Sequence, residues 1–355
     1  MKLLIFTQKV DKNDSTLGFF CTWIREIAKT SESVSVICLE KGQENEQLDL
    51  PKNVTVYSLG KDPVVESTHY RARKWFNKLF YLKNFYHYLL LISGSYDKVF
   101  VHMNQEYILF AGLYWKLKNI PIYFWRNHPR GNLFTYIAVL LSTKVFCTSK
   151  NSFTARFKKT IIMPAGIDIT LYRPINGVVR KKYSVCMVGR ISPIKHVELA
   201  LEAVNEIISS GVQISLNIIG NPTEKDLTYY SSLKKYVEKN NLSTCVSFTE
   251  AVLPDKLPEI YNSHEVCLNL TEDGSFDKTI VEASACGAIP LVSNISLTGM
   301  LPDVCITQSF VSGVARSLKV LLDAHQKVEI QDQLKSFVES QSLSFLVEKL
   351  FAELA

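Results

Sequence analysis

The segment Val188-Gly-Arg-Ile-Ser-Pro-Ile-Lys-His196 joins an apolar run, Ser184–Val188, to a stretch with helical spacing, Val197–Ser209. A strand that turns sharply at Gly189 into a helix is the repeating step of an open α/β sheet. Arg190 can bind a phosphate with two N–H groups, and Lys195 adds a point charge near the free N–H groups of the helix start. The segment therefore predicts an anion-binding turn, with a basic surface loop as the alternative interpretation.

The same alternation of short β-branched runs and longer amphipathic stretches extends outward in both directions and indicates parallel sheets flanked by helices. We expect strands at residues 3–7, 34–39, 54–59, 98–102, 120–125, 145–148 and 161–164, and then at 184–188, 213–219, 245–248, 266–270 and 289–292. The punctuated segment Tyr172-Arg-Pro-Ile-Asn-Gly-Val178 separates the two series. The prediction is an α/β protein of two doubly wound, Rossmann-like domains with a ligand cleft between them.

A second segment, Glu272-Asp-Gly-Ser-Phe-Asp-Lys-Thr-Ile-Val-Glu-Ala-Ser-Ala-Cys-Gly-Ala-Ile-Pro290, has the features of a polar loop that starts a helix. Ser275 or Asp277 could cap that helix, and Gly287 ends it. The N–H groups at the loop–helix junction suit phosphate and sugar hydroxyls, and Glu282 could reach a ribose diol. The alternative is that Glu282 is a surface residue of an amphipathic helix.

Composition and missing motifs exclude several classes of function. The 355 residues are 47% hydrophobic and 21% charged, which is typical of a folded globular protein. The sequence lacks the Gly-x-Gly-x-x-Gly, P-loop, Asp-x-Asp and Gly-x-Ser-x-Gly motifs. Its eight cysteines stand singly, away from histidines at metal-ligand spacing. We therefore expect no structural zinc, and a reducing, cytoplasmic location, because neither a signal peptide nor a membrane-spanning run is evident.

Charge is divided unevenly along the chain. Residues 1–175 contain 24 Lys and Arg against 13 Asp and Glu, whereas residues 176–355 contain 16 against 21. The basic half includes His69-Tyr-Arg-Ala-Arg-Lys-Trp-Phe-Asn-Lys-Leu-Phe-Tyr-Leu-Lys83, in which cations alternate with aromatic and aliphatic residues. This pattern favours a helix at residues 69–83 that lies on anionic lipid, or a helix packed on the first sheet. Nucleic acid is not an expected partner, because no binding motif accompanies the charge.

Together the two motif segments resemble glycosyltransferase family 4, which has a Gly-Arg…Lys diphosphate site and a Glu-x7-Glu loop–helix that ends in Ala-x-Ala-x-Gly. The segments Gln8–Trp23 in the loop after the first strand, Val101-His-Met-Asn104 and Pro164-Ala-Gly-Ile-Asp168 look like the acceptor-side loops and hinge of that family. The resemblance implies the GT-B fold, with residues 1–175 as the acceptor domain, 176–335 as the nucleotide-sugar domain and 336–355 as a helix packing back across both.

The resemblance also implies an activity: a retaining, metal-independent transferase that moves a sugar from a nucleoside diphosphate, expected to be UDP, to a hydroxyl of a glycan or lipid-linked glycan, as in bacterial polysaccharide biosynthesis. The nucleotide-sugar is a substrate, so no cofactor is expected. The residues with an implied catalytic role are Arg190, Lys195, Glu282 and His128. The implied donor-binding residues are Gly189, Arg190, Lys195, Gly220, Val252, Gly274, Ser275, Phe276, Asp277, Lys278, Thr279 and Glu282. The implied acceptor-binding residues are Gly18, Phe19, Cys21, Asn104 and His128.

Two departures from the family pattern bear on specificity. Gly274 stands eight positions before Glu282, where the family has its first Glu, so a carboxylate to the sugar must come from Asp273 or Asp277 or be absent. Cys21 stands where relatives tend to have His. The alternatives that stay open are a sugar-nucleotide epimerase, an inverting transferase, and a catalytically silent protein that keeps the fold as a scaffold or regulatory partner.

Overall fold

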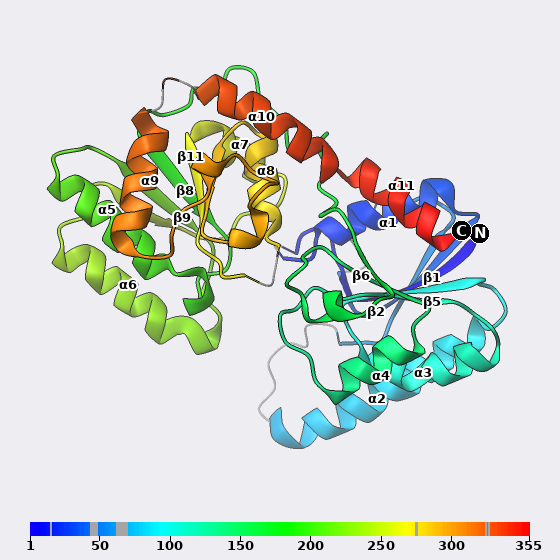
Figure 1. The fold of residues 1–355 in the computed structure, drawn as a ribbon. Helices are drawn as coiled ribbons and strands as arrows, with labels where there is room; N and C mark the ends of the chain where they lie inside the picture. Colours follow the sequence, from blue (N-terminus) through cyan, green and yellow to red (C-terminus); the bar gives the residue numbers. More distant parts are fainter. Residues whose placement is uncertain (15, 43–48, 62–69, 274–275, 324, 326) are drawn as a thin grey trace. The chain divides into compact units, whose positions relative to one another are not determined.

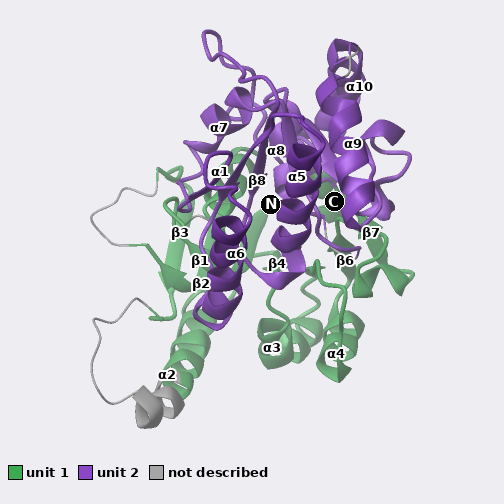
Figure 2. Cartoon of the chain, turned by 90° about the vertical axis from the view of Figure 1, so that its left-hand side faces the viewer, with its two compact units in different colours: residues 1–163, 347–355 green, residues 164–346 purple. Residues whose placement is uncertain are grey.

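The computed structural model describes residues 1–14, 16–42, 49–61, 70–273, 276–323, 325 and 327–355; within 70–77 it describes the backbone alone. The chain forms two compact units (Figure 2). The first contains residues 1–163 and 347–355, and the second contains residues 164–346.

The first unit alternates strands and helices along the chain (Figure 1). Its elements are β1 (Lys2–Val10), α1 (Phe19–Thr30), β2 (Ser33–Lys41), β3 (Val54–Ser58), α2 (Tyr70–Leu91), β4 (Lys98–His102), α3 (Glu106–Leu117), β5 (Ile122–Trp125), α4 (Leu133–Leu141), β6 (Lys144–Cys147), a 3₁₀ turn (Phe153–Arg156) and β7 (Thr160–Ile162).

In the described part of this unit, the strands form a seven-stranded sheet in the order β3-β2-β1-β4-β5-β6-β7, and the pairs are parallel. The central strands are apolar on both faces because helices cover both faces of the sheet. On one face, α2, α3 and α4 share a core with the sheet through Phe85, Trp115 and Val139. Figure 1 shows these three helices together on one side of the sheet and α1 on the other.

The second unit repeats the pattern with a smaller sheet. Its elements are β8 (Ser184–Val188), α5 (Val197–Ser209), β9 (Ser215–Ile219), α6 (Leu227–Lys239), β10 (Val246–Thr249), α7 (Leu257–Ser263), β11 (Val266–Asn269), α8 (Lys278–Ala285), β12 (Ile289–Val292), α9 (Val311–Asp323) and α10 (Lys327–Ser340), with 3₁₀ turns at Pro193–Lys195, Glu224–Asp226, Ile295–Leu297 and Asp303–Cys305. Its described strands form a parallel sheet in the order β10-β9-β8-β11-β12. The strand order reverses at β8, where the helices that follow β8 and β11 lie on opposite faces, so the carboxyl ends of these two strands are the expected ligand-binding place.

The last helix, α11 (Leu343–Leu354), leaves the second unit and packs on the first from Val347 onward. Lys144 donates from Nζ to the Glu353 carboxylate at 3.0 Å, and Lys98 donates to the carbonyl of Leu354. Cations at a helix C-terminus satisfy its free carbonyl groups and complement its dipole. These bonds hold the end of the chain against the first residues of β4 and β6.

The units divide at Met163–Pro164 and again at Leu346–Val347, whereas the expected domain boundaries lay at 175 and 335. The physical reason is local. The N–H groups of Gly166 and Ile167 donate to the carbonyl of Gln341, and Leu343 donates back to Ile167, so the chain directly after Pro164 is bonded to the end of the second unit.

Each predicted strand is present, and its ends lie within two residues of the expected ones except in β1, which runs three residues further, to Val10. The α/β prediction is confirmed. The cleft between the domains stays a prediction. Among the described residues, no helix is long and apolar enough to cross a bilayer.

Candidate functional site

Two glycines bring the carboxyl ends of β8 and β9 into direct backbone contact. Gly189 and Gly220 have φ angles of +141° and +150°, which L side chains rarely adopt. A Cβ atom on Gly220 would lie 1.9 Å from the carbonyl oxygen of Gly189, well inside contact distance. The two glycines therefore let the chain turn toward Arg190 with no side chain in the way.

A small recess opens at this edge of the sheet. It is lined by backbone and side chains from the ends of β8, β9 and β11 and from the turn after β8, namely Met187, Val188, Gly189, Arg190, Ile191, Lys195, Val197, Ile218, Leu268, Asn269 and Thr271. The guanidinium-bearing Arg190 is exposed beside it, and Lys195 is half-buried. The sequence-predicted cations are thus brought to one place.

Lys195 is held by an anion of the protein itself. Its Nζ lies 2.5 Å from Oδ2 of Asp277 and donates to the hydroxyl of Thr271 at 3.1 Å. The same Asp277 oxygen accepts from Thr271 at 2.7 Å and from Asn269 at 2.9 Å. Burial opposes the charge on Asp277, but Lys195 and these donors outweigh it and hold the pKa of the carboxyl below its usual range. The site is a charged, fully bonded network at the carboxyl end of β11.

Asn269 and Thr271 are contributions that the sequence interpretation missed. Asn269 also donates from Nδ2 to the hydroxyl of Thr279 at 3.2 Å, so it joins the end of β11 to the first turn of α8. Their position directly after an apolar strand was the available signal, because polar side chains at the carboxyl ends of parallel strands face the ligand edge.

Glu282 is buried one turn into α8, next to two other polar groups. The hydroxyl of Tyr261, on α7, donates to its Oε2 at 3.0 Å. Burial raises the pKa of the Glu282 carboxyl to about 7, although the bond from Tyr261 and the charge of Lys278 oppose the rise. Burial also lowers the pKa of the Lys278 ammonium, and the negative charge of Glu282 partly offsets that effect. The role of Glu282 on a ribose stays a prediction.

The other residues predicted to bind the donor differ in how deeply they are buried. Phe276 is buried and its ring faces Phe337, so any contact to a ligand would come from its backbone. Val252, after β10, is partly buried against the core of the second unit. Gly274 and Ser275 lie outside the described residues. Of the two proposed substitutes for the missing Glu, Asp277 binds Lys195, and Asp273 is exposed and accepts from the N–H of Ser296 at 3.4 Å.

His196, which the sequence interpretation did not assign, lies next to the cation turn in a left-handed conformation with φ +50°. Its Nδ1 lies 3.1 Å from Glu198 and its Nε2 lies 3.3 Å from Glu272. Non-glycine residues in this conformation are uncommon and often occur at functional sites. His196 thus links the two motif segments through Glu272.

In the first unit, the predicted acceptor loop is tightly folded around Gly18. A Cβ on Gly18 would lie 2.5 Å from the carbonyl oxygen of Asp14, which accepts the Gly18 N–H at 2.9 Å. Lys9 binds Asp14 at 2.9 Å and Glu40 at 3.0 Å. Burial opposes the charge on Lys9, but the hydrogen bonds to these carboxylates outweigh it and raise its pKa. The loop is thus fixed to the ends of β1 and β2.

The other acceptor-side residues divide into buried and accessible groups. Cys21 is buried, and burial raises the pKa of its thiol to about 11, so it is a core residue that does not face solvent. Phe19 is half-buried with its ring 5.7 Å from that of Trp23. Asn104 is half-buried after β4 and follows Met103, whose φ of +68° is left-handed. His128 is exposed, and its Nδ1 accepts from the N–H of Arg130 at 3.0 Å.

His102, which ends β4, was quoted in the sequence but not assigned a role. Its ring is buried, stacks on Phe20 at 4.1 Å between centroids, and its Nδ1 lies 3.1 Å from the hydroxyl of Thr7. It fixes α1 against the carboxyl ends of β1 and β4, and so positions the loop that Gly18 ends.

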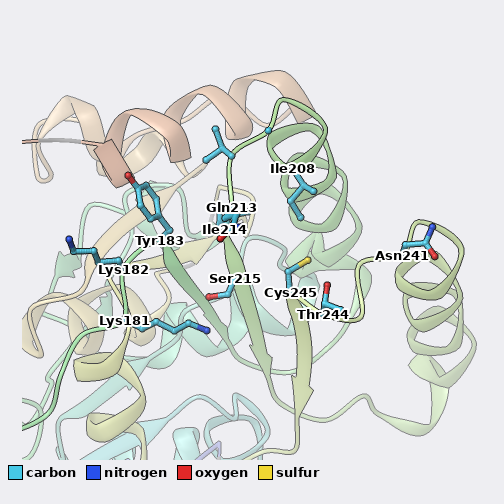
Figure 3. Close-up of a pocket in the computed structure, with 12 residues that line it drawn as sticks. Lys181, Lys182, Tyr183, Ile208, Gln213, Ile214, Ser215, Asn241, Thr244 and Cys245 are labelled. Atoms are coloured by element: carbon cyan, nitrogen blue, oxygen red, sulfur yellow. The ribbon is translucent and has the colours of Figure 1, made fainter.

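A larger pocket of about 600 Å³ lies at the opposite edge of the second sheet. It is formed by the amino ends of β8, β9 and β10 and the end of α5, and Lys181, Lys182, Tyr183 and Cys245 are among its residues (Figure 3). Figure 3 shows the side chains of Lys181 and Lys182 pointing in opposite directions. The pocket therefore lacks converging cations, and the smaller recess at the carboxyl edge has the chemistry of an anion site.

Comparison with known proteins agrees with this geometry. Residues 168–343 match the family described as "Glycosyl transferases group 1". The match covers most of the second unit, residues 164–346. The D-inositol 3-phosphate glycosyltransferase of Rhodococcus opacus (strain B4) is 26% identical over 194 residues, 47% of this chain and 44% of that protein. The protein of the same name from Rhodococcus jostii (strain RHA1) is 26% identical over 149 residues, 39% of this chain and 33% of that protein. The chain thus spans less than half the length of these relatives.

Solved structures with a similar fold match this chain over its whole length. Anabaena Alr3699/HepE in complex with UDP and glucose has a TM-score of 0.77 and 17% identity, covering 100% of this chain and 99% of that one. The sucrose-phosphate synthase from Thermosynechococcus elongatus has a TM-score of 0.76 and 14% identity, covering 99% and 98%. The GT-B fold and the resemblance to glycosyltransferases that the sequence predicted are confirmed.

Proposed function

We propose that this protein is a glycosyl transferases group 1 enzyme, and that it transfers a sugar from a nucleoside diphosphate, UDP, to a hydroxyl of a glycan or lipid-linked glycan, with retention of the anomeric configuration. The observation that carries the proposal is the recess at the ends of β8 and β11. There, Gly189 and Gly220 keep the backbone accessible while Arg190 and Lys195 supply positive charge. The Anabaena neighbour has been solved with UDP-glucose, which supports the choice of base.

The chemistry we propose is stabilisation of the leaving group. As the bond from the sugar to the diphosphate breaks, negative charge grows on the phosphate oxygens. Fixed cations and the N–H groups at the start of a helix stabilise that charge without having to reorganise. In the proposed site Arg190 binds the phosphates with two N–H groups, and Lys195, already oriented by Asp277, binds as a point charge. We propose that these cations do the work of a divalent metal, so the transfer needs neither metal nor cofactor.

On the acceptor side, the proposed contacts are the loop at Gly18, the turn at Asn104 and the exposed His128. We place the reaction in the cytoplasm, at the inner face of the cell membrane, as a step in polysaccharide biosynthesis. Eight free cysteines support a reducing compartment. The proposed membrane contact at residues 69–83 falls partly outside the described residues, although the exposed Lys78 and Lys83 are within them.

The test is a transfer assay with a panel of UDP-, GDP- and ADP-sugars, preceded by thermal-shift measurements with the three nucleotides. We expect UDP to stabilise the protein, EDTA to leave transfer unchanged, and NMR to show the product anomer retained from the donor. A protein that no nucleotide stabilises would refute the proposal and favour a silent scaffold. An inverted anomer would refute the retaining mechanism alone.

A further inference from the structure

Three helices of the first unit expose leucines on their outer side. They are Leu90 and Leu91 on α2, Leu113 and Leu117 on α3, and Leu133 and Leu140 on α4, which we call the leucine face. These side chains are between 62% and 76% exposed, and among the described side chains no other leucine exceeds 60%. Soluble surfaces rarely gather apolar side chains in this way, and such patches mark interaction sites.

The leucine face is one continuous layer, because the three helices pack on each other and on the same sheet face. Tyr86 of α2 donates from its hydroxyl to the carbonyl of Phe110 on α3 at 3.2 Å. A Cβ on Gly112 of α3 would meet Leu141 of α4 at 2.9 Å, so these two helices are also in close contact. Both views show α3 and α4 side by side (Figures 1 and 2).

The sequence of α4 makes the exposure unusual. Leu133-Phe-Thr-Tyr-Ile-Ala-Val-Leu-Leu141 has no charged residue, and a helix that is apolar all round is normally buried. Here Ala138 and Val139 face the core, whereas Leu133 and Leu140 face outward. The outer side of α4 is therefore apolar as well.

The charge of the surrounding chain indicates what the leucine face contacts. Residues 78–159, which include the leucine face, contain 12 Lys and Arg but only two acidic residues, Asp97 and Glu106. Exposed Lys83, Lys116 and Lys118 lie on or directly after the same helices as the leucines. Exposed apolar side chains beside cations match the acyl and headgroup layers of an anionic bilayer. A second copy of the same face would bring like charges together, and nucleic acid would leave the leucines in water.

We infer that the leucine face docks on an anionic lipid surface by inserting the outer leucines of α3 and α4 below the headgroups, with Lys83, Lys116 and Lys118 at the phosphates. Asn132 caps the start of α4 and directly follows the loop that holds His128. Docking would place this acceptor-side loop at the membrane surface. The inference rests on the proposed function only where it takes the acceptor to be lipid-linked.

Vesicle flotation of the full chain tests the inference, with 30% phosphatidylglycerol in phosphatidylcholine against phosphatidylcholine alone. We expect binding to the anionic vesicles. The triple variant Leu113→Ser, Leu117→Ser, Leu140→Ser should weaken the partition coefficient by about 10²-fold or more. The charge reversal Lys83→Glu, Lys116→Glu, Lys118→Glu should weaken it by about 10²-fold.

Matched controls lie on the second unit. Val179→Ser, Ile295→Ser, Val328→Ser removes three comparably exposed apolar side chains, and Lys225→Glu, Lys235→Glu, Lys239→Glu makes the same change in charge. We expect both controls to bind vesicles as the wild type does. A Leu140→Trp variant gives an independent reading, because brominated lipid should quench its added fluorescence, whereas Leu227→Trp on α6 should not be quenched.

Three results would overturn the inference. The wild type could fail to bind anionic vesicles, the controls could lose binding as much as the leucine variant, or the wild type could be a dimer that the leucine variant converts to a monomer. Calorimetric titration of UDP in the absence of lipid tests the proposed function separately from membrane docking by the leucine face. Absence of UDP binding would refute the donor site without bearing on the leucine face. Absence of vesicle binding would refute docking by the leucine face without bearing on the donor site.

Discussion

The contact between Gly189 and Gly220 gives the most specific prediction. In Gly220→Ala the new methyl group would lie 1.9 Å from the Gly189 carbonyl oxygen, at a φ of +150°. The backbone conformation alone costs an L residue about 1–3 kcal/mol. Relieving the clash requires β8 and β9 to separate, and overpacking of this kind costs about 1–3 kcal/mol more. We expect a loss of about 4 kcal/mol in the free energy of unfolding.

Gly211→Ala is the matched control. Gly211 has a φ of +84°, but a Cβ there would have nothing within 4 Å, so only the backbone penalty of about 1 kcal/mol applies. The difference of about 3 kcal/mol should lower the Tm of Gly220→Ala by about 6–12 °C more than that of Gly211→Ala. The new Cβ atom at position 220 would also lie 3.6 Å from the backbone nitrogen of Arg190, so UDP affinity should fall in Gly220→Ala alone.

The assay is thermal unfolding followed by circular dichroism, with UDP titration by calorimetry on each variant at a temperature where both are folded. Equal losses of Tm in the two variants would show that β8 and β9 do not approach as closely as described. An unchanged UDP affinity in Gly220→Ala would show that the turn does not contact the nucleotide.

Three further predictions concern single side chains. Because burial raises the folded-state pKa of Glu282 from 4.5 to about 7, the folded protein binds more protons than the unfolded chain between these values, and stability should fall as pH rises through this window. Glu282→Gln should remove about 1–3 kcal/mol of that decline, measured as the pH dependence of Tm, and an identical slope in both proteins would contradict the assignment. Of the eight cysteines, Cys245 alone is half-buried while the others are buried, so native thiol titration should give one fast-reacting group that Cys245→Ser abolishes; several fast thiols would contradict the packing. His128→Ala should change stability by less than about 0.5 kcal/mol, because the side chain is exposed, yet lower kcat/KM by about 10²-fold; transfer at the wild-type rate would exclude His128 from the site.

The sheets could be predicted from the sequence because their signals are local. Runs such as Val99-Phe-Val101 and Val185-Cys-Met187 are apolar on both faces, which is typical of covered parallel strands. The turn at Gly189 was also predictable, since glycines at strand–helix junctions act within a few residues. The start of α8 after Asp277 was predictable too, although the Asp277 side chain makes no capping bond and binds Lys195.

What could not be predicted depends on contacts across the fold. Lys195 and Asp277 are 82 positions apart, and their ion pair exists because β8 and β11 are neighbours in the sheet. The burial of Glu282 under Tyr261 is set by α7, while its spacing alone equally allows a surface position. The division at Met163–Pro164 follows from backbone bonds to Gln341, whereas the punctuated segment at residues 172–178 indicated a later boundary. Exposed leucines on α4 contradict the burial that its composition favours.

In the proposed site Lys195, beside the Gly189–Gly220 contact, binds the diphosphate of a UDP-sugar. Calorimetric titration of UDP into the wild type, Lys195→Met and Lys182→Met measures it directly. Lys182 lies in the pocket at the opposite edge of the same sheet, so it controls for the loss of one positive charge. We predict that Lys195→Met weakens binding by about 10–100-fold, as expected for one charge-assisted hydrogen bond, and that Lys182→Met binds as the wild type does. UDP binding that survives Lys195→Met, or that falls equally in both variants, would exclude Lys195 from the diphosphate site.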